Sequence, residues 1–154
     1  MILISLLSKS ISSHLIPIAS PILHPVPSKN LKIVLSGSKK FIPKFFELEK
    51  QLTNMGHQVV VPREFMVEME KRDASLLHFS EIQKDDVDCL LIVNESKNGF
   101  ENYIGANGFA EIAFGFYFQK KVYLLNDIYE PYREELEGWG IIPLKGDLSV
   151  FKTK

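Results

Sequence analysis

Short, continuously apolar segments alternate with segments of helical periodicity along most of this chain, and this alternation constrains the fold more than any other feature. Continuously apolar runs are typical of strands buried on both faces, and the helices between them are typical of crossover connections. The expected strands are Leu31–Leu35, Gln58–Val61, Val87–Val93, Lys121–Leu125 and Ile141–Ile142. The expected helices are Lys39–Met55, Ser75–Lys84, Gly105–Gln119 and Glu130–Trp139, while Arg63–Asp73 suits a loop and an exposed helix equally well.

This order of elements predicts an α/β fold, a three-layer flavodoxin-like or Rossmann-like sandwich around a roughly five-stranded parallel sheet. The apolar strands require helices on both faces of that sheet. Ligands of open α/β sheets bind outside the carboxyl ends of the strands. The segments to inspect for a site are therefore those that follow the first, third and fourth strands.

Residues 1–30 differ in composition from residues 31–154, which we expect to form one α/β domain. The first thirty residues contain no Asp or Glu, two lysines and four prolines. The apolar run Met1–Leu7 has no basic residue before it and no clear cleavage site after it, and Pro17 and Pro21 interrupt any longer apolar span. We expect a flexible extension or a translated upstream region rather than a secretory or anchoring segment.

The charge and the cysteine content exclude several classes of protein. The 18 Lys and Arg against 19 Asp and Glu give a formal net charge of −1, which provides no basic surface for a nucleic-acid polymer. The single Cys89 excludes a disulfide framework and a cysteine-based zinc cluster, and the four histidines lie far apart in the sequence. We expect a cytoplasmic protein with no metal, no cofactor and no membrane partner.

Two short polar segments lie next to the expected strands. Ser36, Gly37, Ser38 and Lys39 follow the first strand, where backbone N–H groups at a helix start suit an anion; the same residues also suit an ordinary strand–helix turn with a serine cap. Asp88 enters the third strand. A carboxylate in that place either solvates the start of the strand or holds a substrate group.

The strongest candidate is Glu111, in the helix expected after Gly105. Residues 109–118 are apolar almost all round, which predicts a buried helix, and Glu111 is its only charge before Lys120. A buried carboxylate is unfavourable unless it is paired or open to a cleft. Its place in or near the first turn predicts an ionised group, because the helix dipole favours an anion there. Such a carboxylate suits covalent catalysis at a sugar carbon, and a capping role at the helix start explains it equally well.

In their order along the chain, these segments resemble the nucleoside 2-deoxyribosyltransferase-like superfamily, which includes deoxynucleotide N-glycosidases. The resemblance covers roughly residues 31–127. It is carried by the segments Leu35–Ser38, Asp88–Val93, Gly105–Gly115 and Lys121–Leu125. Family enzymes often carry a further acid about six positions before the nucleophile, where this chain has Gly105, with Tyr103 and Asn107 as substitutes.

The resemblance implies that Glu111 attacks the sugar C1′, expels the base and forms a glycosyl-enzyme, which water or a second base then resolves. It also implies that Asp88 protonates or orients the base, and that the Ser36–Lys39 turn lies at the sugar or 5′-phosphate. The other substrate-binding residues that it implies are in the glycine-rich loop: Tyr103, Gly105, Asn107 and Gly108.

Two other functions stay open at this point. One is a nucleotide sensor of the same fold without turnover, in which Glu111 hydrogen-bonds a ribose hydroxyl. The other is an NAD-cleaving relative with a TIR-like arrangement. In each case the expected partner is a small nucleoside or nucleotide, and the apolar surfaces together with the resemblance favour a homodimer or higher homo-oligomer.

Overall fold

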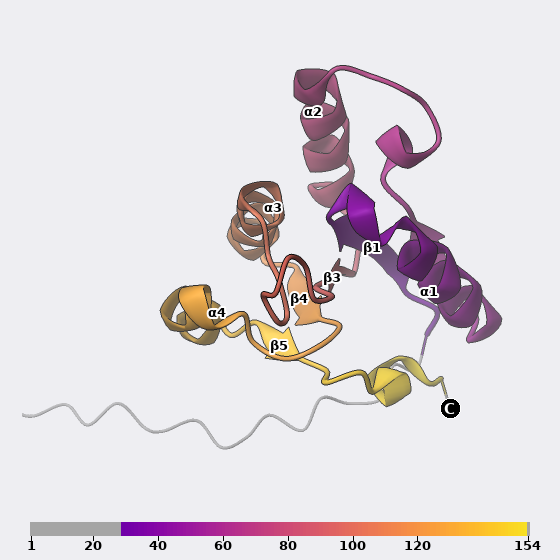
Figure 1. The fold of residues 1–154 in the computed structure, drawn as a ribbon. Coiled ribbons are helices and arrows are strands. Elements are labelled where there is room, and N and C mark those ends of the chain that lie inside the picture. Colours follow the sequence, from indigo (N-terminus) through magenta and orange to yellow (C-terminus); the bar gives the residue numbers. More distant parts are fainter. Residues whose placement is uncertain (1–28, 154) are drawn as a thin grey trace, which may run out of the picture.

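The structure, a computed structural model, describes residues 29–153, so the extension expected for residues 1–30 lies outside it except for Lys29 and Asn30. Five parallel strands form one sheet in the order β2-β1-β3-β4-β5 (Figure 1). The strands are β1 (Lys32–Gly37), β2 (Gln58–Val60), β3 (Cys89–Val93), β4 (Lys121–Leu124) and β5 (Ile142–Pro143). The predicted α/β class, with a parallel flavodoxin-like or Rossmann-like sheet, is confirmed.

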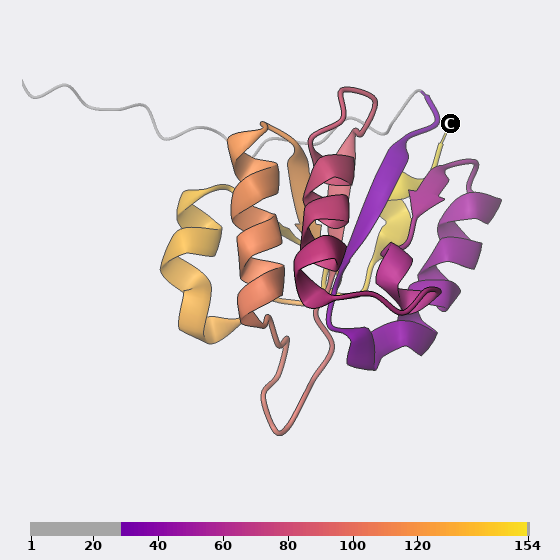
Figure 2. The same cartoon turned by 90° about the horizontal axis from the view of Figure 1, so that it is seen from above.

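Helices connect the strands and cover both faces of the sheet. The α-helices are α1 (Ile42–Asn54), α2 (Lys71–Ile82), α3 (Ala106–Tyr117) and α4 (Arg133–Gly138). The short 3₁₀ helices are η1 (Lys39–Phe41), η2 (Arg63–Phe65), η3 (Glu130–Tyr132) and η4 (Leu148–Phe151). Seen from above, α2 and α3 lie side by side over one face of the sheet (Figure 2). Residues of α1 pack in the core on the opposite face.

Two apolar cores hold the three layers together, because successive side chains of each strand point to opposite faces. One core joins Val34, Leu90 and Ile92 of the strands to residues of α2, α3 and α4. The other joins Ile33 and Leu35 to residues of α1 and η4. Both faces of β3 are buried, which explains why its sequence is continuously apolar.

For Arg63–Asp73 the sequence allowed either a loop or an exposed helix, and the structure contains both. Residues 63–65 form η2, a loop follows, and α2 begins at Lys71, four residues before the expected start at Ser75. The charges of this segment lie on an exposed surface, so no periodic apolar stripe marked the beginning of the helix.

The outer end of α3 differs from the prediction of a fully buried helix. Phe116, Tyr117 and Phe118 are exposed, Tyr117 most of all, while Glu111, Ile112 and Gly115 are buried. A Cβ atom on Gly115 would lie 3.0 Å from a Leu90 methyl group, so the glycine lets α3 approach the sheet closely. Glu111 precedes Gly115 by one helical turn and therefore shares the face that looks toward the sheet.

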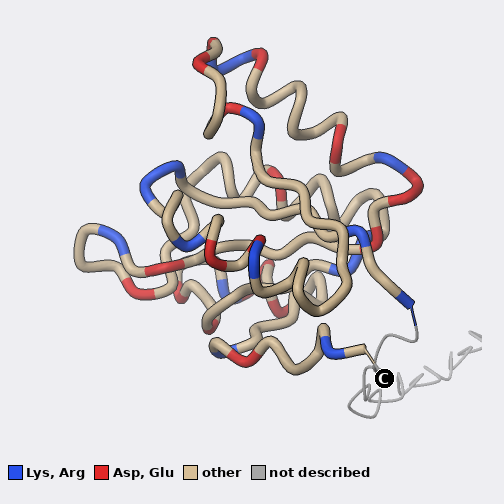
Figure 3. Tube along the Cα trace, turned by 90° about the vertical axis from the view of Figure 1, so that its right-hand side faces the viewer, with Lys and Arg blue, Asp and Glu red and all other residues tan. Residues whose placement is uncertain are grey.

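Acidic and basic residues are interspersed along the described chain (Figure 3). Within residues 29–153, none of the helices is long and apolar enough to cross a membrane. In the same residues, His, Cys, Asp and Glu side chains do not gather in a group of three that could hold a metal ion.

Candidate functional site

A pocket of about 360 Å³ opens at the carboxyl ends of β1 and β3. These two strands are adjacent in the sheet, and the chain leaves them in opposite directions, to β2 on one side and β4 on the other. Such a switch point is where open α/β sheets bind ligands, and the volume lies in the range of small-molecule sites. The wall at the strand ends consists of Gly37, Ser38, Ile92 and Val93.

The turn after β1 performs two tasks at once. The Ser38 hydroxyl accepts a hydrogen bond from the Lys40 N–H and caps η1, as the ordinary turn interpretation predicts. Ser38 and Lys39 also line the pocket. Gly37 has φ +149°, and a Cβ atom there would lie 2.7 Å from the Val93 carbonyl oxygen. Only glycine therefore lets β1 end this close to β3.

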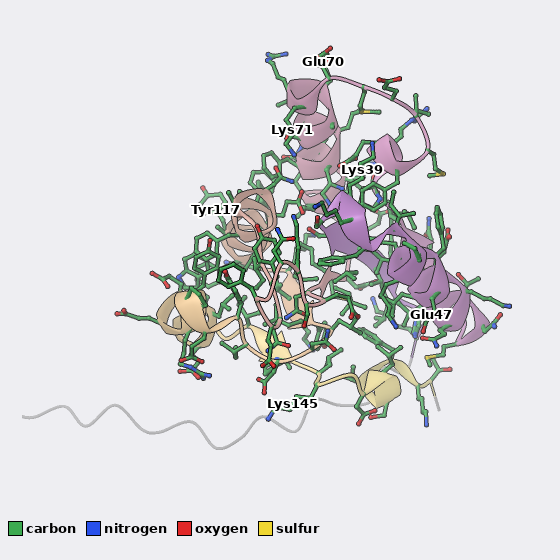
Figure 4. The ribbon with its side chains drawn as sticks, viewed as in Figure 1. Lys39, Glu47, Glu70, Lys71, Tyr117 and Lys145 are labelled. Atoms are coloured by element: carbon green, nitrogen blue, oxygen red, sulfur yellow. The ribbon has the colours of Figure 1, made fainter. Side chains whose placement is uncertain are left out.

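Three lysines surround the pocket, against the single carboxylate of Glu64. Lys39 comes from η1, Lys71 from the first turn of α2, and Lys97 from the loop after β3. Figure 4 shows Lys39 and Lys71 on these two facing elements. The first residues of α3 line the same space, so unpaired helix N–H groups add to the positive potential. The pocket is suited to an anionic ligand.

The loop after β3 closes one side of the pocket. Lys97 Nζ donates to the Ser38 hydroxyl at 3.3 Å and lies 4.7 Å from the centre of the Tyr103 ring. Asn98 and Gly99 form a turn in this loop, and both residues have positive φ. Lys97 thus connects the turns that follow β1 and β3.

A buried asparagine, which the sequence analysis did not single out, holds this loop to the next one. Asn94 follows β3 directly, and its side-chain amide donates to the Asp127 carbonyl at 2.8 Å. Its Oδ1 accepts the Asn126 N–H at 2.9 Å. The only sequence signal is its position, a polar residue immediately after an apolar strand.

Glu111 lies behind the pocket rather than on its wall. Its side chain is 3% exposed, and Oε1 accepts a hydrogen bond of 2.7 Å from Asn107 Nδ2. Asn107 does line the pocket, and so separates the carboxyl group from the ligand space. Glu111 is the sixth residue of α3 and caps none of its N–H groups, which removes the capping interpretation.

Burial raises the pKa of Glu111 to about 8, and the nearby Glu64 acts in the same direction. Lys71 and the Asn107 hydrogen bond oppose the rise without cancelling it. The expectation of a group kept ionised by the helix dipole is therefore corrected. Glu111 is too far from the helix start for the dipole to outweigh the loss of water.

His78 of α2 faces the same carboxyl group. Its Nε2 lies 3.6 Å from Glu111 Oε2, and both side chains are buried. Burial lowers the pKa of His78 to about 4. Among residues 29–153, the buried side-chain atoms without a hydrogen-bond partner are Ser36 Oγ, His78 Nε2 and Glu111 Oε2. Such atoms are few in native proteins and are often found where function requires them.

The structure does not bring Asp88 to this pocket. Asp88 precedes β3, so it lies at the amino edge of the sheet, whereas the pocket lies at the carboxyl edge. Its carboxylate accepts the Lys32 N–H at 2.8 Å and pairs with Lys29 at 3.0 Å. Partial burial acts against them, but these two contacts hold the pKa of Asp88 below its usual value. This geometry fits the strand-solvating role and separates Asp88 from Glu111.

The other predicted binding residues come together, with one exception. Ser36 is fully buried and does not line the pocket. Those that do are Gly37, Ser38, Lys39, Tyr103, Gly105, Asn107 and Gly108. Lys71, Lys97 and His78 were not predicted, because nothing in the sequence shows which face of α2 or which end of a loop turns toward the pocket.

Fold and site define the class of this protein: a flavodoxin-like α/β domain with a cationic pocket at the switch point of its sheet and a buried carboxyl group behind it. No protein-family model, curated protein or solved structure matches the chain.

Proposed function

We propose that this protein binds a nucleoside or nucleotide in the switch-point pocket and cleaves or transfers its N-glycosidic bond, with Glu111 as nucleophile. The observation that carries the proposal is the position of Glu111, a buried carboxyl group one side chain away from a pocket bordered by three lysines. A carboxylate that attacks C1′ needs such a partly dry, fixed position.

In this proposal the cationic side of the pocket holds the sugar-phosphate end of the ligand. Lys39, Lys71 and the N-terminal turn of α3 supply the charge that a phosphate group requires. Tyr103 and Phe65 provide apolar surface on the pocket wall for the base or the sugar. Attack requires the Asn107 side chain to rotate away from Glu111 Oε1, so that the carboxylate faces the ligand.

A specific observation favours a second candidate, a nucleotide sensor without turnover. The carboxyl group is sealed behind Asn107 and is protonated near neutral pH. In that case Asn107 itself contacts the ligand, and Glu111 fixes the orientation of the Asn107 amide from behind.

Incubation with nucleosides, 5′-monophosphates and NAD, followed by chromatography of free base, separates the candidates. Base release by the wild type but not by Glu111→Gln supports glycosyl transfer, and the substrate that is consumed identifies the class. Glu134→Gln, which alters an exposed carboxylate on α4, is the matched control. Binding without release by either protein favours the sensor, and equal release by wild type and Glu111→Gln excludes Glu111 as the nucleophile.

A further inference from the structure

We infer that His78 is a positioning residue for Glu111 that takes up its carboxyl proton and so generates the nucleophile inside the protein. This inference rests on the proposed function. The geometry that carries it is the approach of two buried, otherwise unpartnered atoms, His78 Nε2 and Glu111 Oε2, at 3.6 Å. At 3.6 Å the two atoms are not hydrogen-bonded, and a closer approach lets one hydrogen satisfy both, whichever atom holds it.

The charged groups around the pair act on both members. Glu81, also on α2, favours protonation of His78, and Lys71 opposes it. Glu64, in η2, disfavours the Glu111 carboxylate, and Lys71 favours it. Lys71 thus supports the ionised carboxylate but not the imidazolium. The pKa values of about 4 for His78 and about 8 for Glu111 make the neutral pair the resting form. In this inference the ion pair forms as a minor state, held by the mutual attraction of its two members, which is strong in a dry site.

His78 also borders a cavity that is separate from the substrate pocket. His78 lines a second cavity of about 540 Å³ between α2 and the segment of β2 and η2, together with Ser80 and Glu81. Glu111 thus lies between Asn107, which faces the substrate pocket, and His78, which faces the second cavity. The two cavities share no lining residue, so a ligand in the first does not occupy the second.

Oε2–H passes its proton to Nε2, which leaves a carboxylate and an imidazolium. The carboxylate forms the O–C1′ bond while the C1′–N bond breaks and its electron pair leaves with the base. When water attacks C1′, the carboxylate is regenerated, the proton of the water goes to the departed base, and the imidazolium returns its proton to Glu111.

His78→Gln tests the inference through the pH dependence of base release. In the wild type the pair keeps one proton between the two pKa values of about 4 and about 8, so kcat/KM is level between them. In His78→Gln the carboxyl group loses its proton only to solvent, so kcat/KM falls about tenfold for each pH unit below 8. Leu76→Ala, an exposed change on the same helix and outside both cavities, keeps the wild-type profile. A level profile in His78→Gln overturns the inference.

A second measurement does not depend on activity. In NMR titrations of the wild type, the His78 ring nitrogens shift together with the Glu111 carboxyl carbon near pH 8, and this shift disappears in Glu111→Gln. If His78 responds only near pH 4, the inference is wrong, even if His78→Gln fails to fold. Coupled titration in a protein that releases no base contradicts the proposed function but supports the shared proton.

Discussion

The ring of His57 joins two segments that are far apart in the sequence: its Nε2–H donates to the Phe151 carbonyl oxygen at 2.6 Å. Its Nδ1 accepts the Leu31 N–H at 3.0 Å, so the imidazole is neutral with the hydrogen on Nε2. In the sequence His57 follows the helix-ending Gly56, where a capping cation is the ordinary expectation. The structure shows instead a buried tether between η4 and the start of β1.

Replacement of His57 by alanine removes both hydrogen bonds and leaves the Leu31 N–H and the Phe151 carbonyl without their partner. We expect the free energy of unfolding to fall by about 2–6 kcal/mol, since each of the two orphaned groups costs about 1–3 kcal/mol. Urea denaturation measures the change. An unchanged midpoint would show that the tether contributes nothing to stability.

The Glu111 and His78 pKa shifts predict opposite changes of stability with pH. The pKa of Glu111 is raised from 4.5 to about 8, so its contribution is complete below pH 4.5 and is lost as the pH rises to 8. The pKa of His78 is lowered from 6.5 to about 4, so its contribution is complete above pH 6.5 and is lost as the pH falls to 4. The pair therefore contributes a plateau between about pH 4.5 and 6.5, where the two slopes cancel.

Substitution of Glu111 isolates its contribution to the pH dependence of the free energy of unfolding. Relative to wild type, Glu111→Gln gains stability as the pH rises from 4.5 to 8, by at most about 1.4 kcal/mol per pH unit. Thermal denaturation across this range, with Glu134→Gln as the control, tests the prediction. A constant difference between wild type and Glu111→Gln would mean that the burial of Glu111 does not alter its titration.

Replacement of Asn107 by alanine removes the hydrogen bond to Glu111 Oε1, which now lowers the pKa of that group. We expect the pKa of Glu111 to rise above about 8, and ligand affinity to fall because a pocket-lining amide is lost. A carbon-13 NMR titration of the carboxyl group measures the first effect. Ser75→Ala, which removes only a weak 3.5 Å contact to Asn107, keeps the wild-type value.

Neutralisation of a pocket lysine tests whether the cationic side of the pocket holds the phosphate group of the ligand. Lys71→Gln is expected to weaken the binding of a nucleoside 5′-monophosphate about tenfold, or about 1.4 kcal/mol, and to leave the affinity for the nucleoside unchanged. Lys50→Gln on α1, outside the pocket lining, serves as the control. Titration calorimetry at two salt concentrations gives both affinities. An equal loss for nucleoside and nucleotide would place the phosphate elsewhere.

The position of Asp88 at the amino edge of the sheet predicts that it takes no part in ligand binding. Asp88→Asn keeps the wild-type affinity for every ligand that the pocket binds, but it loses the ionic contact with Lys29. Reduced ligand affinity in a fully folded Asp88→Asn protein contradicts the separation of the two edges.

The predicted strands and helices agree with the structure because their signals are local. The apolar run Val87–Val93 contains β3, and Gly105 is the residue that precedes α3, as its sequence position indicates. The start of α2 was not predictable in this way. Its helix has no dominant apolar stripe, and its position depends on Ala74, His78 and Ile82, which contact neighbours far away in the sequence.

The sequence by itself determined the α/β class, the parallel sheet and the edge where a ligand pocket forms, because these follow from the periodicity and order of its elements. It also indicated Glu111, since one carboxylate stands out in an apolar helix. Only the tertiary structure decided that Asp88 lies at the opposite edge, that Lys71 and Lys97 join the pocket, and that His78 faces Glu111. The physical reason is that the charge state of a side chain depends on its burial, and the groups it can reach depend on how segments far apart in the sequence pack together. Neither property can be read from the local sequence.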